Sequence, residues 1–449
     1  MPALPPKALS RIWARRQLVR FVLAVTFSAA VATTPSHAQD RDRSRDNDSH
    51  HHKLDLSRLI VVGDSLSAGF QNDSLLDTQQ PHGYASLVAA QANVPLLLPL
   101  IAPPGIPNVL ELVSPGPPPI LTTAPGTSPG RDDPTIQVTD LAVPGASLSD
   151  VLNTRPSLPV TPSNILTDLI LGEPGVAFGE IRSQVEWARA LDATTIFIWA
   201  GNEDALGAAL AADPALLTPI PKFRADYSEL ISRLSARGVT LVVANIPDVT
   251  IIPYLTPSED VAEELGLPLF VIEPILGISS GDFVTPDAIP LILARLANPS
   301  LGPLPANVIL TAANATKIRA FVDAYNAIIA NQAREAGATL VDIHQVANRI
   351  RRRGTAANGQ ILTNEFLGGI FSLDGVHPTN TGYGVIANAF IGALNAEFEA
   401  DIPYVSIDQL AKTDPLVFPG IEPPDSIQRH VDPGTAKSLR DSFVTHPAP

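Results

Sequence analysis

Ser65, Asp374 and His377 are the residue types of a nucleophile and its proton relay. Asp374 and His377 are three residues apart, in the segment Asp-Gly-Val-His-Pro. On a turn, this spacing lets the carboxylate bind one imidazole nitrogen, so that the other nitrogen can face a serine hydroxyl. A serine hydroxyl is a poor nucleophile until a base removes its proton, and an imidazole with a pKa near neutrality suits that task. The three side chains therefore predict covalent catalysis with Ser65 as the nucleophile.

Each of these residues also has a simpler explanation. Serine is common in turns and at helix N-termini, and His377 is one of nine histidines. Two other histidines compete as bases. His344 ends a predicted strand, where we expect it to pack and to bind backbone, and His82 lies in a predicted loop. The Asp-x-x-His-Pro context favours His377 over both.

Short apolar strands are needed to hold these residues in place. The sequence predicts five of them, at residues 59–62, 137–141, 195–199, 239–244 and 339–343. Each is followed by a helical segment, which predicts a parallel sheet covered on both faces, a three-layer α/β/α domain. The active sites of such sheets lie beyond the carboxyl ends of the strands, where Ser65 and the polar segment 202–204 fall.

The predicted domain spans residues 57–400 and carries two large insertions, at about 94–134 and 249–307. Both are apolar and interrupted by proline. The first has no sustained periodicity and predicts an extended loop, whereas the second predicts short helices. The two insertions either frame an apolar pocket or only cover the edges of the sheet.

Hydrolysis through a serine also needs donors for the oxyanion of the tetrahedral intermediate. The backbone N–H groups of Ser65 and Gly145 are the candidates, because glycine lets the chain approach a substrate closely. Gly145 follows the predicted strand at 137–141.

The sequence resembles the GDSL/SGNH hydrolases, and specifically their bacterial lipase-like branch. Four ordered segments carry the resemblance: Gly-Asp-Ser-Leu at 63–66, Ala-Val-Pro-Gly-Ala at 142–146, Asn-Ile-Pro-Asp-Val-Thr at 245–250, and Asp-Gly-Val-His-Pro at 374–378. The resemblance covers about residues 59–398. It implies a flavodoxin-like fold and hydrolysis of carboxylic esters or thioesters without a metal. The G-x-S-x-G turn of α/β-hydrolases is missing from the sequence.

One segment departs from that family. Where the family shows Gly-x-Asn-Asp, with an Asn that donates to the oxyanion, this chain has Gly201-Asn202-Glu203-Asp204. Glu203 occupies the Asn position, and a carboxylate cannot donate unless it is protonated. Three explanations stay open: Asn202 substitutes for the missing donor, which we favour; Glu203 is held protonated by burial; or the enzyme is slowed.

The first 38 residues predict a signal peptide. They combine five cations and no acid with an apolar run at 21–31 and the small-residue sequence Ser36-His37-Ala38, so we expect cleavage near Ala38 and export to the periplasm or the medium. Arg15-Arg16 is a weak match to a twin-arginine signal. The apolar run is too short to span a bilayer, so no stable membrane anchor is expected.

The segments on either side of the domain predict little regular structure. Residues 39–56 are largely polar and charged, which predicts a disordered linker, and residues 401–449 form a proline-rich extension.

Composition excludes several classes of function. The chain has no cysteine and a formal net charge of −15. The lack of cysteine excludes disulfides and a thiol nucleophile, and an acidic surface repels nucleic acid. No H-E-x-x-H, P-loop or dinucleotide motif is present, so no metal or other cofactor is expected.

We therefore expect an exported serine esterase or lipase acting on a small-molecule or lipid-like acyl ester. A carbohydrate O-deacetylase or thioesterase of the same family is the alternative within the enzymes. A catalytically weakened acyl-binding protein is the alternative outside them. The sequence leaves the oligomeric state undetermined.

Overall fold

The computed structural model describes residues 53–115, 120–157, 164–175 and 179–418. The predicted signal peptide, residues 39–52 of the predicted linker and residues 419–449 lie outside these ranges. Those predictions therefore remain predictions.

A parallel sheet forms the centre of the described domain. Its strands are β1 (Leu59–Gly63), β4 (Thr195–Trp199), β5 (Thr240–Ala244) and β9 (Thr339–Val341), in the spatial order β1-β4-β5-β9. All neighbouring pairs are parallel. Every residue of β1 and β4 is buried, as expected when helices cover both faces of a parallel sheet.

The prediction of about five strands was slightly too high, because residues 137–141 do not form a strand. They run beside β1 and make one parallel bridge, between Val61 and Asp140. The backbone N–H of Val61 donates to Thr139, and that of Leu141 donates to Val61. The Asp140 carboxylate then accepts from the N–H of Ala142 at 3.1 Å, which turns the backbone away from the sheet.

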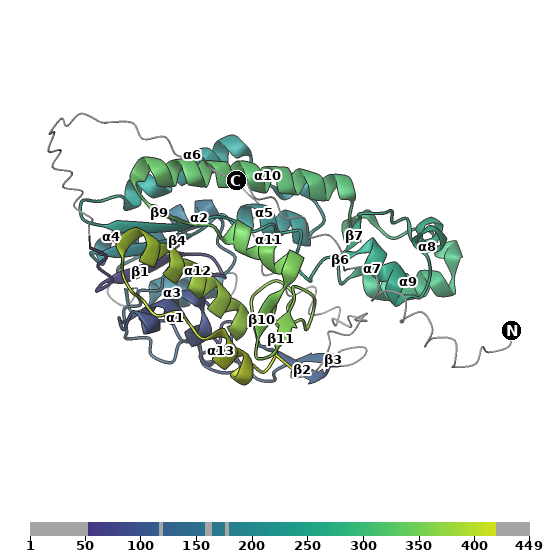
Figure 1. The fold of residues 1–449 in the computed structure, drawn as a ribbon, viewed down its shortest axis with the longest axis horizontal. Coiled ribbons are helices and arrows are strands. Elements are labelled where there is room, and N and C mark those ends of the chain that lie inside the picture. The colour runs from purple at the N-terminus through teal and green to yellow at the C-terminus, as the bar shows by residue number, and fades with distance from the viewer. Residues whose placement is uncertain (1–52, 116–119, 158–163, 176–178, 419–449) are drawn as a thin grey trace, which may run out of the picture. The chain divides into compact units, whose positions relative to one another are not determined.

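Helices cover both faces of the sheet, which confirms the three-layer α/β/α fold. On one side α1 (Tyr84–Gln91) packs against α12 (Asn380–Phe398). On the other side the helices pack on one another: α2 (Leu148–Asn153), α4 (Gln184–Ala190), α6 (Ile220–Leu234) and α10 (Ala312–Ala336). Figure 1 shows α6 and α10 above the strands and α1 below them.

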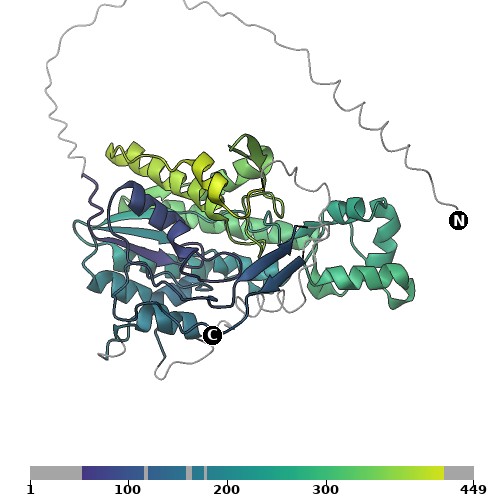
Figure 2. The same ribbon diagram turned by 90° about the horizontal axis from the view of Figure 1, so that it is seen from below.

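The two insertions have more regular structure than their sequences predict. The first, expected to be an extended loop, contains an antiparallel hairpin of β2 (Leu110–Ser114) and β3 (Ile120–Thr123). The second contains the expected helices α7 (Ser258–Glu264), α8 (Leu269–Leu276) and α9 (Ala288–Ala297), together with a small sheet. The strands of that sheet are β6 (Thr256–Pro257), β7 (Phe283–Val284) and β8 (Ile309–Leu310). This second insertion has its own small apolar core and stands to one side of the main sheet (Figure 2).

The last part of the described chain adds a helix and a hairpin over the carboxyl ends of the strands. The predicted strand 339–343 ends at Val341, because the Asp342 carboxylate accepts from the N–H of Gln345 and begins α11 (Ile343–Arg353). A hairpin of β10 (Thr355–Ala357) and β11 (Gln360–Leu362) follows. The predicted irregular extension contains α13 (Ile407–Thr413) in its described part. No helix within residues 53–418, where described, is both long and apolar enough to cross a membrane.

Candidate active site

The structure brings Ser65, His377 and Asp374 together in one hydrogen-bonded chain. Ser65 Oγ lies 2.8 Å from Nε2 of His377, and Nδ1 of His377 lies 3.1 Å from Oδ2 of Asp374. Ser65 and His377 are each 1% exposed. This is the arrangement in which an imidazole can take a serine proton while a carboxylate stabilises the resulting imidazolium.

The end of β1 sets the position of Ser65. Gly63 lies so close to β4 that a Cβ atom on it would be 2.3 Å from the carbonyl oxygen of Trp199. Glycine is therefore required there, and the chain turns directly into Asp64 and Ser65. The backbone carbonyl of Asp64 accepts from the N–H groups of Ser67 and Ala68, which closes the turn.

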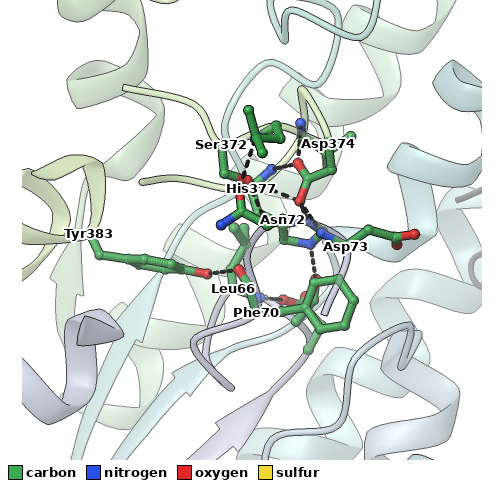
Figure 3. Close-up of polar contacts among 12 residues, drawn as sticks. Leu66, Phe70, Asn72, Asp73, Ser372, Asp374, His377 and Tyr383 are labelled. Atoms are coloured by element: carbon green, nitrogen blue, oxygen red, sulfur yellow. Dashed lines mark hydrogen bonds and ion pairs between the residues drawn. The ribbon is translucent and has the colours of Figure 1, made fainter. Parts of the chain in front are cut away.

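Asp374 is held by donors on both of its oxygens. Oδ1 accepts from the N–H groups of Val376 at 2.7 Å and His377 at 2.8 Å. Oδ2 accepts from the Ser372 hydroxyl at 3.0 Å and from the N–H of Asp73 at 2.9 Å (Figure 3). Burial alone would raise the pKa of Asp374, but His377 and these backbone donors lower it below its ordinary value. The carboxylate is thus kept charged beside the imidazole.

The loop that donates to Asp374 was missed by the sequence analysis. Asn72 and Asp73 both have positive φ, 54° and 57°, a conformation that Asn and Asp adopt more readily than most residues. The Asn72 side chain accepts from the N–H of Leu373 at 3.0 Å, and its own N–H donates to the Ser372 hydroxyl at 3.0 Å. The sequence signal that could have indicated this loop is the pair Asn72-Asp73 shortly after Gly63-Asp64-Ser65.

Asn202 lines the pocket beside Ser65, but its amide is bound to Asp64. Nδ2 of Asn202 donates to Oδ2 of Asp64 at 2.8 Å, while Oδ1 of Asn202 is buried without a partner. Burial raises the pKa of Asp64 to about 7, although the bonds from Asn202 and from the N–H of Leu66 lower it in part.

Glu203 lines the same pocket as the first residue of α5 (Glu203–Leu210). Both of its carboxyl oxygens are buried and have no hydrogen-bond partner in the described structure. Burial raises the pKa of Glu203 well above its ordinary value, and the nearby carboxylates of Asp64, Asp204 and Asp150 raise it further.

Gly145 lies in the turn between residues 137–141 and α2. Its φ of 79° falls in the left-handed region that favours glycine. Ser147 begins α2 in a capping box with Asp150, and the N–H of Leu148 donates to the Asp204 carboxylate at 2.8 Å. This bond ties the Gly145 turn to the first turn of α5.

An apolar pocket with a cavity volume of about 90 Å³ opens beside Ser65 and His377. Its wall is formed mainly by three segments: the chain after β5, helix α11, and residues 370–378. Their apolar members are Val249, Ile251, Ile252, Ile343, Val346, Ala347, Ile350, Ile370, Phe371 and Val376. The first insertion contributes no residue to this wall, and the second contributes only its first residues.

The two competing histidines lie elsewhere. Nδ1 of His344 is 3.0 Å from the carbonyl oxygen of Ile246 and 3.3 Å from the amide of Asn326, so this ring packs against backbone as expected. His82 ends the 3₁₀ helix Gln80–His82, and its partial burial lowers its pKa. Neither lines the pocket of Ser65.

A three-layer fold with this site at the carboxyl ends of its strands is that of an α/β protein of the hydrolase class. A family model described as GDSL-like Lipase/Acylhydrolase matches residues 59–390, and the chain belongs to this family. The resemblance seen in the sequence is confirmed, and the family makes the protein an acyl ester hydrolase of lipase or esterase type.

The similarity to individual proteins is lower. No curated protein matches the chain. One similar solved structure is LAE5, an alpha/beta hydrolase from the metagenome of Lake Arreo, Spain, with 13% identity, a TM-score of 0.35, and coverage of 76% of this chain and 96% of the other. Another is phospholipase A1 from Streptomyces albidoflavus NA297, with 14% identity, a TM-score of 0.32, and coverage of 76% and 98%.

Proposed function

We propose that the protein is an exported serine esterase or lipase that cleaves carboxylic acyl esters through an acyl-enzyme on Ser65. The observation that carries this proposal is the bond of 2.8 Å between Ser65 Oγ and His377 Nε2, within a chain that ends at Asp374. Asp374 and His377 complete the catalytic triad. The reaction requires no metal or other cofactor.

The reaction proceeds in two halves. His377 Nε2 takes the hydroxyl proton as Ser65 Oγ bonds to the ester carbonyl carbon, and the carbonyl electron pair moves to oxygen. The tetrahedral intermediate collapses, the bond to the alcohol oxygen breaks, and His377 returns the proton to that oxygen. Water then repeats the sequence on the acyl-enzyme and releases the acid. The N–H groups of Ser65 and Gly145 are the proposed backbone donors to the oxyanion.

The substrate is an ester with an extended apolar acyl chain. The pocket beside Ser65 is lined mainly by apolar side chains, including Ile252, Val346 and Ile350. Transfer of each methylene group into such a pocket is worth about 0.8 kcal/mol. We therefore expect kcat/KM to rise with acyl chain length up to the capacity of the pocket.

A panel of nitrophenyl esters and thioesters, run on wild type and Ser65→Ala, tests the proposal. Ser65→Ala should lose more than about 10³-fold in kcat, and a fluorophosphonate should label wild type at Ser65. Preference for acetate alone would favour the carbohydrate O-deacetylase, and thioester preference would favour the thioesterase. Folded wild type that neither turns over nor labels would favour an acyl-binding protein.

Export is the second part of the proposal. The basic and apolar N-terminus that ends near Ala38 supports cleavage and release into the periplasm or the medium. Expression of the full chain in a bacterial host, fractionation, and sequencing of the mature N-terminus test this. An intact Met1 in a cytoplasmic fraction would contradict it.

A further inference from the structure

Glu203 lines the pocket and takes no part in the proposed reaction as described so far. It shares the pocket with Ser65 and His377, and it begins α5 four residues after β4 ends at Trp199. Its two carboxyl oxygens are buried, and within the described residues no donor or cation binds them. An ionised carboxylate in that state would lose its hydration without compensation.

The charged groups around Glu203 all raise its pKa. The groups that act on it are the carboxyls of Asp64 at the β1 turn, Asp204 on its own helix, and Asp150 on α2. His377 faces Asp64 across the same site and lowers the pKa of Asp64. Three carboxyls together with burial favour the neutral form of Glu203 at neutral pH.

Asn202, the other candidate donor, is anchored to the turn before Ser65. Its Nδ2 donates one of its two hydrogens to Asp64 at 2.8 Å, which fixes the amide at the turn before Ser65. Asn202 therefore acts as a positioning residue for Asp64.

We propose that Glu203 is a neutral carboxylic acid whose O–H donates a hydrogen bond to the oxyanion formed at Ser65. A protonated carboxyl in an apolar site can stabilise an oxyanion in this way. The proton stays on Glu203 throughout, so the reaction gains a donor without an additional proton transfer. This inference rests on the proposed ester hydrolysis and names one further catalytic residue for it.

The inference predicts a specific pattern among three variants. Glu203→Gln keeps an uncharged donor and should hold kcat within about threefold of wild type at neutral pH. Glu203→Ala removes the donor and should lower kcat by about 10²–10³-fold with little change in KM. Glu263→Gln, at an exposed position on α7, is the matched control and should change neither kcat nor KM.

The pH profile separates a donor from a merely structural residue. In wild type, kcat should fall at alkaline pH as Glu203 ionises, whereas in Glu203→Gln this decline should disappear. Wild-type kcat in Glu203→Ala would overturn the inference. So would a several-fold rise in kcat for Glu203→Gln at neutral pH, because that result would show an opposing negative charge.

A measurement on wild type avoids dependence on variants that fold poorly. Infrared spectra of protein labelled with ¹³C at the glutamate carboxyl should show an isotope-shifted carbonyl band of a protonated acid at neutral pH. Absence of that band overturns the inference even if ester hydrolysis stands. Full activity of Ser65→Ala would instead overturn the proposed function and leave the protonation of Glu203 intact.

Discussion

The backbone N–H of Asp73 donates to Oδ2 of Asp374 at 2.9 Å, the same oxygen that faces His377. This bond joins the loop after the Ser65 turn to the turn that carries the acid and the base. The relative position of Ser65 and His377 therefore depends on a few polar contacts between these two loops.

Ser372 is the side chain at the centre of those contacts. Its hydroxyl donates to Asp374 Oδ2 and accepts from the N–H of Asn72, each at 3.0 Å. Ser372→Ala should lower kcat by about 10–100-fold with KM unchanged, because a lost bond to a charged group is worth about 1.5–3 kcal/mol. Steady-state kinetics checks this, with Ser232→Ala on the exposed face of α6 as the control. An unchanged kcat would show that the Asp73 contact is sufficient.

A larger side chain in the wall of the pocket should change the enzyme's preference for the length of the acyl chain. Val346 on α11 lines the pocket and is 9% exposed. Val346→Phe should reduce kcat/KM for dodecanoate esters at least tenfold more than for butyrate esters, since the added ring occupies acyl space. Val113→Phe, at a position 63% exposed on β2, is the control. Equal losses for both esters would mean that the acyl chain does not enter this pocket.

Tyr383 connects α12 to the chain that follows Ser65. Its hydroxyl donates to the carbonyl oxygen of Phe70 at 2.7 Å, and the ring of Phe70 lies 4.8 Å from that of His377. Tyr383→Phe leaves a buried carbonyl without its donor and should lower the free energy of unfolding by about 1–3 kcal/mol. Urea denaturation measures this. Tyr404→Phe, at a position 60% exposed, should have no effect.

Asp140 makes stability depend on pH. Burial raises its pKa to about 8 from 3.8, offset only in part by the N–H of Ala142. The folded state binds this proton more tightly than the unfolded chain does, so the contribution is fully present below 3.8 and is lost as pH rises towards about 8. One such group gives a slope of about 1.4 kcal/mol per pH unit within that window.

Asp140→Asn keeps the acceptor for Ala142 and removes the titration. The stability of the variant should therefore decline less steeply than that of wild type between pH 5 and pH 8, as measured by urea denaturation. Asp64 and Asp204, with pKa values of about 7 and about 6, still titrate in the variant, so part of the slope should persist. Parallel curves for the two proteins would contradict the assignment to Asp140.

The sequence predicted the sheet and the Ser–His–Asp set because both depend on side-chain identity. Buried strands are continuous apolar runs such as 59–62 and 195–199, and their carboxyl ends must meet at one edge. The prediction of a strand at 137–141 was wrong. The apolar residues of this segment face the core, as those of a buried strand would, but its backbone pairs with β1 at one bridge only.

The supporting parts of the site were less predictable. Asp73 acts through its N–H, a group that nearly every residue carries, so no motif marks it. Helix α11 forms a pocket wall through Ile343, Val346 and Ile350, which share one helical face but resemble any core-facing stripe. Whether such a face packs or lines a cavity is decided by neighbours distant in the sequence.

Ser65 and His377 are 312 positions apart along the chain, and this separation has a consequence during synthesis. During translation, the turn with Ser65 and most strands of the sheet are synthesised long before His377 and α12. The unfinished polypeptide thus carries a serine with no base. On the proposed mechanism, acylation of Ser65 requires that the segment carrying His377 has been synthesised and has folded against the Ser65 turn.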